Sequence, residues 1–138
     1  MSGKIQTALE QSDAEAQAVA VAPRVSLADI QAEISAEYTF VLGQALQQLG
    51  CPTVDDYDGT HVLTLHAIVM RNGFVVVGKS APASPENFNE ALGAKFAKED
   101  AMRQLWPLMG YALRDRNLSH ALIKRLRAHH PIARCVLS

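Results

Sequence analysis

The dipeptide Asn72-Gly73, which lies between two apolar runs, constrains the fold more than any other feature of the chain. The run HVLTLHAIVM at 61–70 and the run FVVVG at 74–78 are both rich in β-branched side chains. Asn and Gly tolerate the positive φ angles of a type I′ turn, so the pattern predicts a β-hairpin over about residues 61–80. Because an isolated hairpin is marginally stable, we expect it to pack against helices or to pair with another chain.

Apolar residues at helical spacing precede the hairpin. Ser26 and Asp29 resemble a capping box, and Gly50 followed by Pro52 is a typical stop signal. Between these signals the apolar positions recur every three or four residues, which predicts one helical stripe. Its members are Leu27, Ile30, Ile34, Tyr38, Val41, Leu42, Ala45 and Leu46.

A second helical region follows the hairpin. Ser84 is a suitable N-cap and Pro85 suits the first helical position, so a helix is expected to begin there. Pro107 should break or kink it after Trp106, leaving a short helical stretch and a last helix over about 119–129. The expected fold is therefore α+β, with a β-hairpin (about 61–80) packed with three to four helices.

At 138 residues, the chain is long enough for one modest core. Residues 1–23 are rich in Ala, Gln and Glu, and we expect a mobile or weakly helical segment that folding does not require. Residues 24–138 are expected to form a single α+β domain. No apolar run reaches membrane-spanning length and no secretory signal follows Lys4, so a cytoplasmic location is expected. Cys51 and Cys135 are interpreted as reduced thiols.

The standard catalytic and metal-binding motifs are missing from the sequence. It contains no GxSxG, HExxH or GxGxxG pattern. His61 and His66, five positions apart on a predicted strand, should face opposite sides and cannot share a metal ion. The acidic run at 55–58 lacks the last ligand of an EF-hand. We therefore expect neither an enzyme, nor a metal site, nor a cofactor.

Binding-type side chains gather around the hairpin and the region after it. They offer an aromatic stacking surface, an amide and several cationic donors, and a helix amino end near Asn87 would suit a phosphate. The alternative for each residue alone is a core aromatic, a capping amide or a solvated charge. The candidate ligand-binding residues are Phe74, Lys79, Ser80, Asn87, Arg103, Arg114 and Arg116.

Charge is distributed unevenly along the chain. Residues 1–60 carry two basic and nine acidic side chains, whereas residues 111–138 carry six basic and one acidic. The basic C-terminal helix could bind nucleic acid or a host protein, and this is the alternative function. The same helix could equally be a solvated face beside an acidic segment of the fold.

Three short motifs resemble a phage family. They are RNGF at 71–74, SPENF at 84–88 and LWPLMGYALR at 105–114, with Gly93 between the last two, and the similarity covers most of 24–116. The combination is similar to the small phage proteins of the "gene 49 / gene 66" family. Met109 departs from this pattern, because the family usually carries an acidic or polar residue there.

The pattern also resembles that of phage anti-Thoeris sponge proteins. That resemblance implies an oligomer that sequesters a host immune nucleotide signal without degrading it, either cyclised ADP-ribose or a cyclic oligonucleotide. It further implies that Phe74, Asn87, Arg103 and Arg114 contact the ligand. A homo-oligomer, most simply a dimer, is also expected because a hairpin leaves strand edges that need cover.

Overall fold

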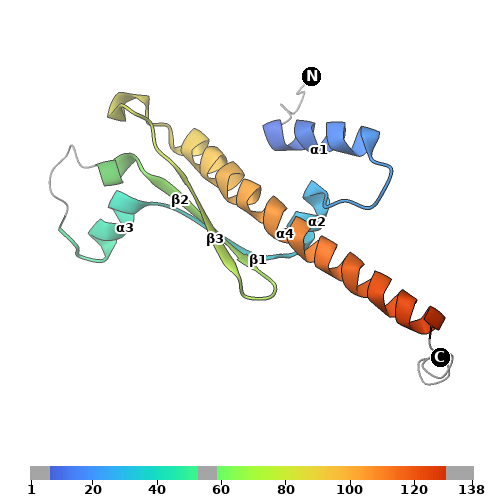
Figure 1. The fold of residues 1–138 in the computed structure, drawn as a ribbon. Helices are drawn as coiled ribbons and strands as arrows, with labels where there is room; N and C mark the ends of the chain where they lie inside the picture. The colour runs from blue at the N-terminus through green and yellow to red at the C-terminus, as the bar shows by residue number, and fades with distance from the viewer. Residues whose placement is uncertain (1–6, 53–58, 130–138) are drawn as a thin grey trace.

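The computed structural model describes residues 7–52 and 59–129, and it contains a three-stranded antiparallel sheet crossed by one long helix (Figure 1). The strands β1 (Ile34–Val41), β2 (Thr64–Met70) and β3 (Val75–Ser80) lie in the order β1-β2-β3. Helix α4 (Glu90–His129) packs against β2 and β3. This confirms the predicted α+β class.

The predicted hairpin is formed by β2 and β3, but its turn is not of type I′. Gly73 has a φ of 87°, while no non-glycine residue among those described has a positive φ, so Asn72 does not take the expected angle. The Met70 N–H donates to the Phe74 carbonyl (2.8 Å), and the Gly73 N–H donates to the Met70 carbonyl (2.9 Å). These bonds define a three-residue connection that ends in a left-handed glycine.

The single helix predicted from Ser26 onward is wrong, although its start is correct. Ser26 Oγ accepts from the Asp29 N–H and Asp29 Oδ2 accepts from the Ser26 N–H, which completes the capping box. Helix α2 then covers only Leu27–Ala32, and the chain continues as β1 and as helix α3 (Leu42–Gln48). The aromatic and β-branched residues at 38–41 favour a strand because the edge of β2 is available for backbone pairing.

The segment after the hairpin also differs from expectation. Ser84 makes no side-chain cap bond, and Pro85–Asn87 form a 3-10 turn, η2, rather than the first turn of the helix. Helix α4 begins at Glu90, and Asn89 Oδ1 accepts from the Leu92 N–H (3.0 Å). Asn87 therefore precedes the helix, and the phosphate site expected from its position in a first helical turn is not formed.

Pro107 does not break α4, which runs for 40 residues without interruption. A proline removes the hydrogen bond to the carbonyl four residues earlier, here that of Arg103. Both Pro107 and Arg103 are exposed, so water can hydrate this carbonyl and the missing bond is tolerated on the solvent side.

The core lies where α4 crosses β2 and β3. Alternate residues of β2 are buried, as expected of a strand covered on one face. Gly78 permits the close approach of β3 and α4, because a Cβ at this position would overlap the Ala97 carbonyl and the backbone of Ala101. The buried cluster consists of Ile30, Ile68, Met70, Val76, Ala101, Met102 and Leu105.

The N-terminal segment contains helix α1 (Ala8–Val19), which starts with a capping box between Thr7 and Glu10. No residue of α1 is buried, although Leu9 packs partly against the core. Arg24 joins α1 to the rest of the chain through an ion pair with Asp13 (2.6 Å). That folding does not require residues 1–23 stays a prediction.

The remaining described element is η1 (Gly59–Val62), a 3-10 turn that leads into β2. The acidic run at 55–58 and Cys135 lie outside the described residues. Within the described ranges, no helix combines the length and the apolar character that crossing a membrane requires.

Candidate binding site

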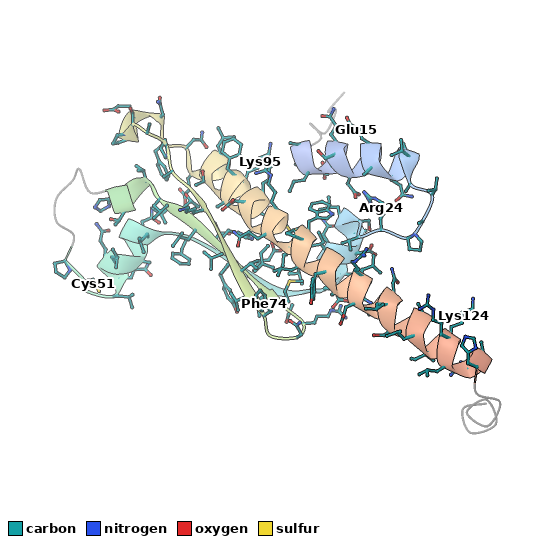
Figure 2. The ribbon with its side chains drawn as sticks, in the orientation of Figure 1. Glu15, Arg24, Cys51, Phe74, Lys95 and Lys124 are labelled. Atoms are coloured by element: carbon teal, nitrogen blue, oxygen red, sulfur yellow. The ribbon has the colours of Figure 1, made fainter. Side chains whose placement is uncertain are left out.

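A hollow of about 840 Å³ lies where the hairpin turn meets α2 and α4. Figure 2 shows Phe74 at this hairpin end of the sheet. A volume of this order is typical of small-molecule sites. Its lining comes from the chain before α2, from α2, from the hairpin and from the middle of α4, and includes Arg24, Val25, Asp29, Glu33, Met70, Asn72, Phe74, Leu105, Leu108, Met109 and Arg116.

The hairpin and α4 give this hollow an apolar base and one accessible ring. Met70 and Leu105 are buried, and Met109 packs partly against the core. Phe74 is 52% exposed, so its ring can still accept a flat partner. Asn72 lies beside it, with Oδ1 accepting from the Phe74 N–H (3.0 Å), which holds the turn and leaves the amide NH₂ for a ligand.

The two arginines of the hollow differ in what they can still bind. The Arg24 guanidinium donates to Asp13 Oδ1 (2.6 and 2.9 Å) and to the Asp13 carbonyl (2.9 Å), so it is largely occupied. Arg116 is exposed, and within the described part of the chain it has no ion-pair or hydrogen-bond partner. Arg116 is therefore the cation of this hollow that can pair with an anionic ligand.

Two carboxylates, Asp29 and Glu33, line the same hollow. Hydrogen bonds from the backbone and side chain of Ser26 hold the pKa of the Asp29 carboxyl below its usual value. The hollow thus presents negative groups from α2 and a positive group from α4. This arrangement suits a ligand that carries both an anion and hydroxyl or amino donors.

The other predicted residues lie elsewhere. Phe74 directly precedes β3 and Ser80 is the last residue of β3. At about 3.3 Å per residue, the two are roughly 20 Å apart. Lys79 lies next to Ser80, and its backbone N–H donates to Asp100 Oδ2 (2.9 Å). Asn87 lies in η2, beyond this end of the sheet. Lys79, Ser80 and Asn87 thus cannot reach the hollow that contains Phe74 within one chain.

Arg103 and Arg114 complete the predicted set and also lie apart from that hollow. Arg103 is exposed and 3.8 Å from Glu99 Oε2, one turn earlier on α4. Arg114 borders a second hollow of about 690 Å³, whose lining comes from α4 alone. A depression on one helix surface offers few convergent groups. Of the seven predicted residues, the structure brings together Phe74 and Arg116 in one hollow.

A polar network on β1 and β2 was not predicted from the sequence. His66, which is 5% exposed, contacts Thr39 Oγ1 through Nδ1 (2.5 Å) and Glu37 Oε1 through Nε2 (2.9 Å). Lys98 Nζ lies 3.2 Å from the same carboxylate oxygen. Burial raises the pKa of Glu37, but the hydrogen bonds from His66 and Lys98 outweigh it and hold the pKa below its usual value.

In this network, Thr39 and Glu37 of β1 supply hydrogen-bond partners to the buried His66 imidazole on the neighbouring strand β2. None of its four residues lines either hollow. Residues 7–52 and 59–129 contain no group of three or more His, Cys, Asp or Glu side chains that could hold a metal ion. The network could not be predicted, because a helix was expected where β1 supplies Glu37 and Thr39. By contrast, Asn72 adjoins the predicted Phe74 in the RNGF motif, and this could have marked it as a lining residue.

Comparison with known protein families identifies a match to a phage family. The model of the Phage protein (N4 Gp49/phage Sf6 gene 66) family matches residues 25–117, which include α2, the sheet and the first two thirds of α4. No curated protein and no solved structure matches the chain significantly.

Proposed function

Since the chain belongs to the phage protein (N4 Gp49/phage Sf6 gene 66) family, we propose that it is a non-catalytic phage protein that sequesters a host immune nucleotide signal. The signal is cyclised ADP-ribose or a cyclic oligonucleotide, and its removal would counter host defence. The observation that carries this proposal is the hollow that holds both an exposed Phe74 and Arg116, whose guanidinium has no partner among the described residues.

The chemistry of the hollow matches the parts of a nucleotide. The Phe74 ring offers a flat face for a base, and the Arg116 guanidinium offers paired donors for a phosphate. Asp29 and Glu33 can accept hydrogen bonds from ribose hydroxyls, as acidic residues do in dinucleotide sites. The apolar base formed by Met70 and Leu105 excludes water beneath the ligand.

Sequestration requires that the ligand leave unchanged. Turnover needs a nucleophile and a base that both reach the bound molecule. Among the described residues, Thr39 and His66 form a hydroxyl–imidazole pair, which is the combination of a nucleophile and a base. Neither residue lines the hollow. This supports binding rather than catalysis.

The proposed site is shared between copies of the chain. Asn87, Arg103 and Arg114 match the positions that the sponge resemblance implies, yet none of them lines the hollow of Phe74. A second copy of the chain could supply these donors without any rearrangement of the fold. We therefore propose a homo-oligomer in which α4 or η2 of one copy completes the hollow of another.

Calorimetry tests this function directly. Wild type should bind at least one ligand from a panel of cyclised ADP-ribose and cyclic oligonucleotides. Phe74→Ala should weaken binding, and Arg116→Ala should cost about 2–4 kcal/mol because the phosphate loses a charge-assisted bond. Arg125→Ala, which removes an exposed arginine of the same helix outside the hollow, is the matched control.

Two further measurements complete the test. Weaker binding by Asn87→Ala or Arg103→Ala would support the shared site, and unchanged binding would confine the ligand to one chain. Mass spectrometry of the released ligand should return the unaltered nucleotide. The function is rejected if nothing in the panel binds below about 10 μM, a free energy of roughly 7 kcal/mol.

The alternative is a regulator that binds nucleic acid or a host protein through the basic end of α4. The observation in its favour is that Arg114, Arg116 and Lys124 are all exposed there, with Arg125 and Arg127 close by. Duplex DNA binding would weaken steeply as salt is raised, because counterions are released on association. A binding constant that barely changes between about 50 and 200 mM salt would exclude this mode.

A further inference from the structure

The two edges of the sheet differ in how they are covered. Backbone groups of alternate β3 residues point away from β2. On this edge, α4 supplies partners: the Gln104 side chain donates to the Val77 carbonyl (2.7 Å), and the Asp100 carboxylate accepts from the Lys79 N–H (2.9 Å). These side chains occupy two of the outward backbone groups that another strand would need, which closes the β3 edge at Val77 and Lys79.

On the β1 edge, no side chain of the described residues 7–52 and 59–129 supplies such cover. The Met70–Phe74 bond shows that even-numbered β2 residues bond to β3, so odd-numbered ones bond to β1. By the β1–β2 register, Ala36, Tyr38 and Phe40 then bond to β2, and the backbone groups of Glu37 and Thr39 face outward. Neither of these outward backbone groups has a hydrogen-bond partner among the residues that the structure describes.

The side chains of β1 are also unusually open. Residues 37–40 are four consecutive exposed positions, with Tyr38 at 59% and Phe40 at 41%. Tyr38 and Phe40 lie on the face of the sheet opposite α4, because they pair with Ala67 and Leu65 and not with the buried residues of β2. An edge with free backbone groups and aromatic side chains is a template for strand pairing.

We propose that β1 pairs antiparallel with β1 of a second copy, so that two sheets join into one continuous six-stranded sheet. The proposal rests on the self-association proposed above but not on nucleotide binding. A second copy fits this edge because the strand is self-complementary about a two-fold axis, and identical strands supply identical donors and acceptors.

Charge and local geometry select the register. The irregular pairing between Ile34 and Ala36 and the start of α3 at Leu42 restrict regular pairing to about 36–41. A two-fold axis at Glu37 would oppose two carboxylates and is unfavourable. An axis at Thr39 places Thr39 opposite Thr39 of the second copy and Glu37 opposite Val41 of the second copy, which keeps the two carboxylates far apart.

This register also pairs the aromatic side chains. Tyr38 lies opposite Phe40 of the second copy, and the symmetry repeats the pair on the other side of the axis. Both are non-hydrogen-bonded pairs, in which the Cα atoms are about 4.5 Å apart and the side chains are closest. Aromatic pairs across strands are among the stabilising contacts of antiparallel sheets.

Disulfide trapping tests the register in full-length protein with Cys51→Ser and Cys135→Ser as background. A Cα separation of about 4.5 Å is compatible with a disulfide. Tyr38→Cys combined with Phe40→Cys should give a covalent dimer under mild oxidation, whereas each single variant should stay monomeric on a non-reducing gel. Efficient trapping by Tyr38→Cys alone would place the axis at Tyr38 and overturn the proposed register.

Sedimentation with a charge exchange tests the interface without covalent trapping. Tyr38→Lys with Phe40→Lys should convert the dimer to monomer at micromolar concentration, since cations would face each other. Tyr38→Lys with Phe40→Glu should restore the dimer, because each cation would face an anion of the second copy. Val77→Lys is the matched control, since Val77 is similarly exposed on the same face but lies on the closed edge.

The outcomes distinguish the β1 interface from other ways in which two copies could associate. A monomeric wild type, or a dimer that the Tyr38 and Phe40 double lysine variant leaves intact, overturns the β1 interface. A dimer lost both on Val77→Lys and in the double lysine variant would mean that the copies stack through the face that carries all three residues instead. Calorimetry can still show nucleotide binding in any of these cases, so failure here is distinct from failure of the proposed function.

Discussion

Gly78 of β3 and Ala97 of α4 are in such close contact that a Cβ on Gly78 would overlap the Ala97 carbonyl oxygen. The glycine is required here for space, because its φ is not in the positive region. The helix and the sheet can approach this closely only at a residue without a side chain. This contact places α4 across β2 and β3 and so sets the position of Arg116 relative to the hairpin turn.

Gly78→Ala should therefore destabilise the protein by about 1–3 kcal/mol or more, since the added methyl group must push the helix from the sheet. Gly110→Ala is the matched control: it lies within α4, nothing approaches its Cβ position within 4 Å, and alanine favours the helix by about 0.5–1 kcal/mol. Urea denaturation of both variants is the measurement. Equal stabilities would show that β3 and α4 are not in close contact.

Gly73→Val should cost about 1–3 kcal/mol, because a β-branched residue is strained at a φ of 87° although space around the site is open. Gly73→Asn should cost less, since Asn tolerates the left-handed region. Thermal melting compares the two. If valine and asparagine are equally tolerated, the turn does not hold this residue at positive φ.

The pH dependence of stability should report the Glu37 carboxylate. Its folded pKa lies below the ordinary value near 4.5, so its contribution is complete above that pH and is lost as pH falls through the folded pKa. Glu37→Gln should thus be less stable than wild type at pH 7, and the difference should shrink below about pH 4.5. Denaturation from pH 7 to pH 3 measures it. Glu86→Gln, at an exposed position, should track wild type.

Trp106→Phe should cost about 1–2 kcal/mol, because Nε1 of Trp106 donates to the Val25 carbonyl (3.1 Å) and this carbonyl would lose its partner. Trp106→Ala should cost about 3–5 kcal/mol, since Trp106 also packs against the core. Guanidinium denaturation gives both values. A Trp106→Ala variant that stays as stable as wild type but loses nucleotide binding would instead place the indole in the ligand site.

The sequence predicted local features better than long-range ones. The capping box of Ser26 and the hairpin around Gly73 depend on residues within a few positions of each other, and both are present. The segment from Ile34 to Val41 fits helical spacing and strand composition alike. Only pairing with β2, some 30 residues later, decides in favour of the strand, and a single sequence does not show that pairing.

The candidate site was predictable to a similar degree. Phe74 and Arg116 share a hollow although 42 positions separate them, and residue type alone suggested both. Asn87 was placed at a helix start because Ser84 and Pro85 are good start signals, yet the helix begins three residues after it, with Asn89 as the capping side chain. Local rules could not decide between two neighbouring capping residues.

The last buried residue of α4 is Leu105, and the helix continues to His129 beyond the sheet (Figure 1). At 1.5 Å per residue, this projecting part is about 36 Å long. It acts as a lever that pivots at Leu105, where the helix leaves the core. A tilt of about 10° at the anchored half would move the far end by about 6 Å, whereas Arg116, less than halfway along, would move by under about 3 Å. A contact at the far end of this helix would therefore also shift Arg116 relative to Phe74 in the hollow.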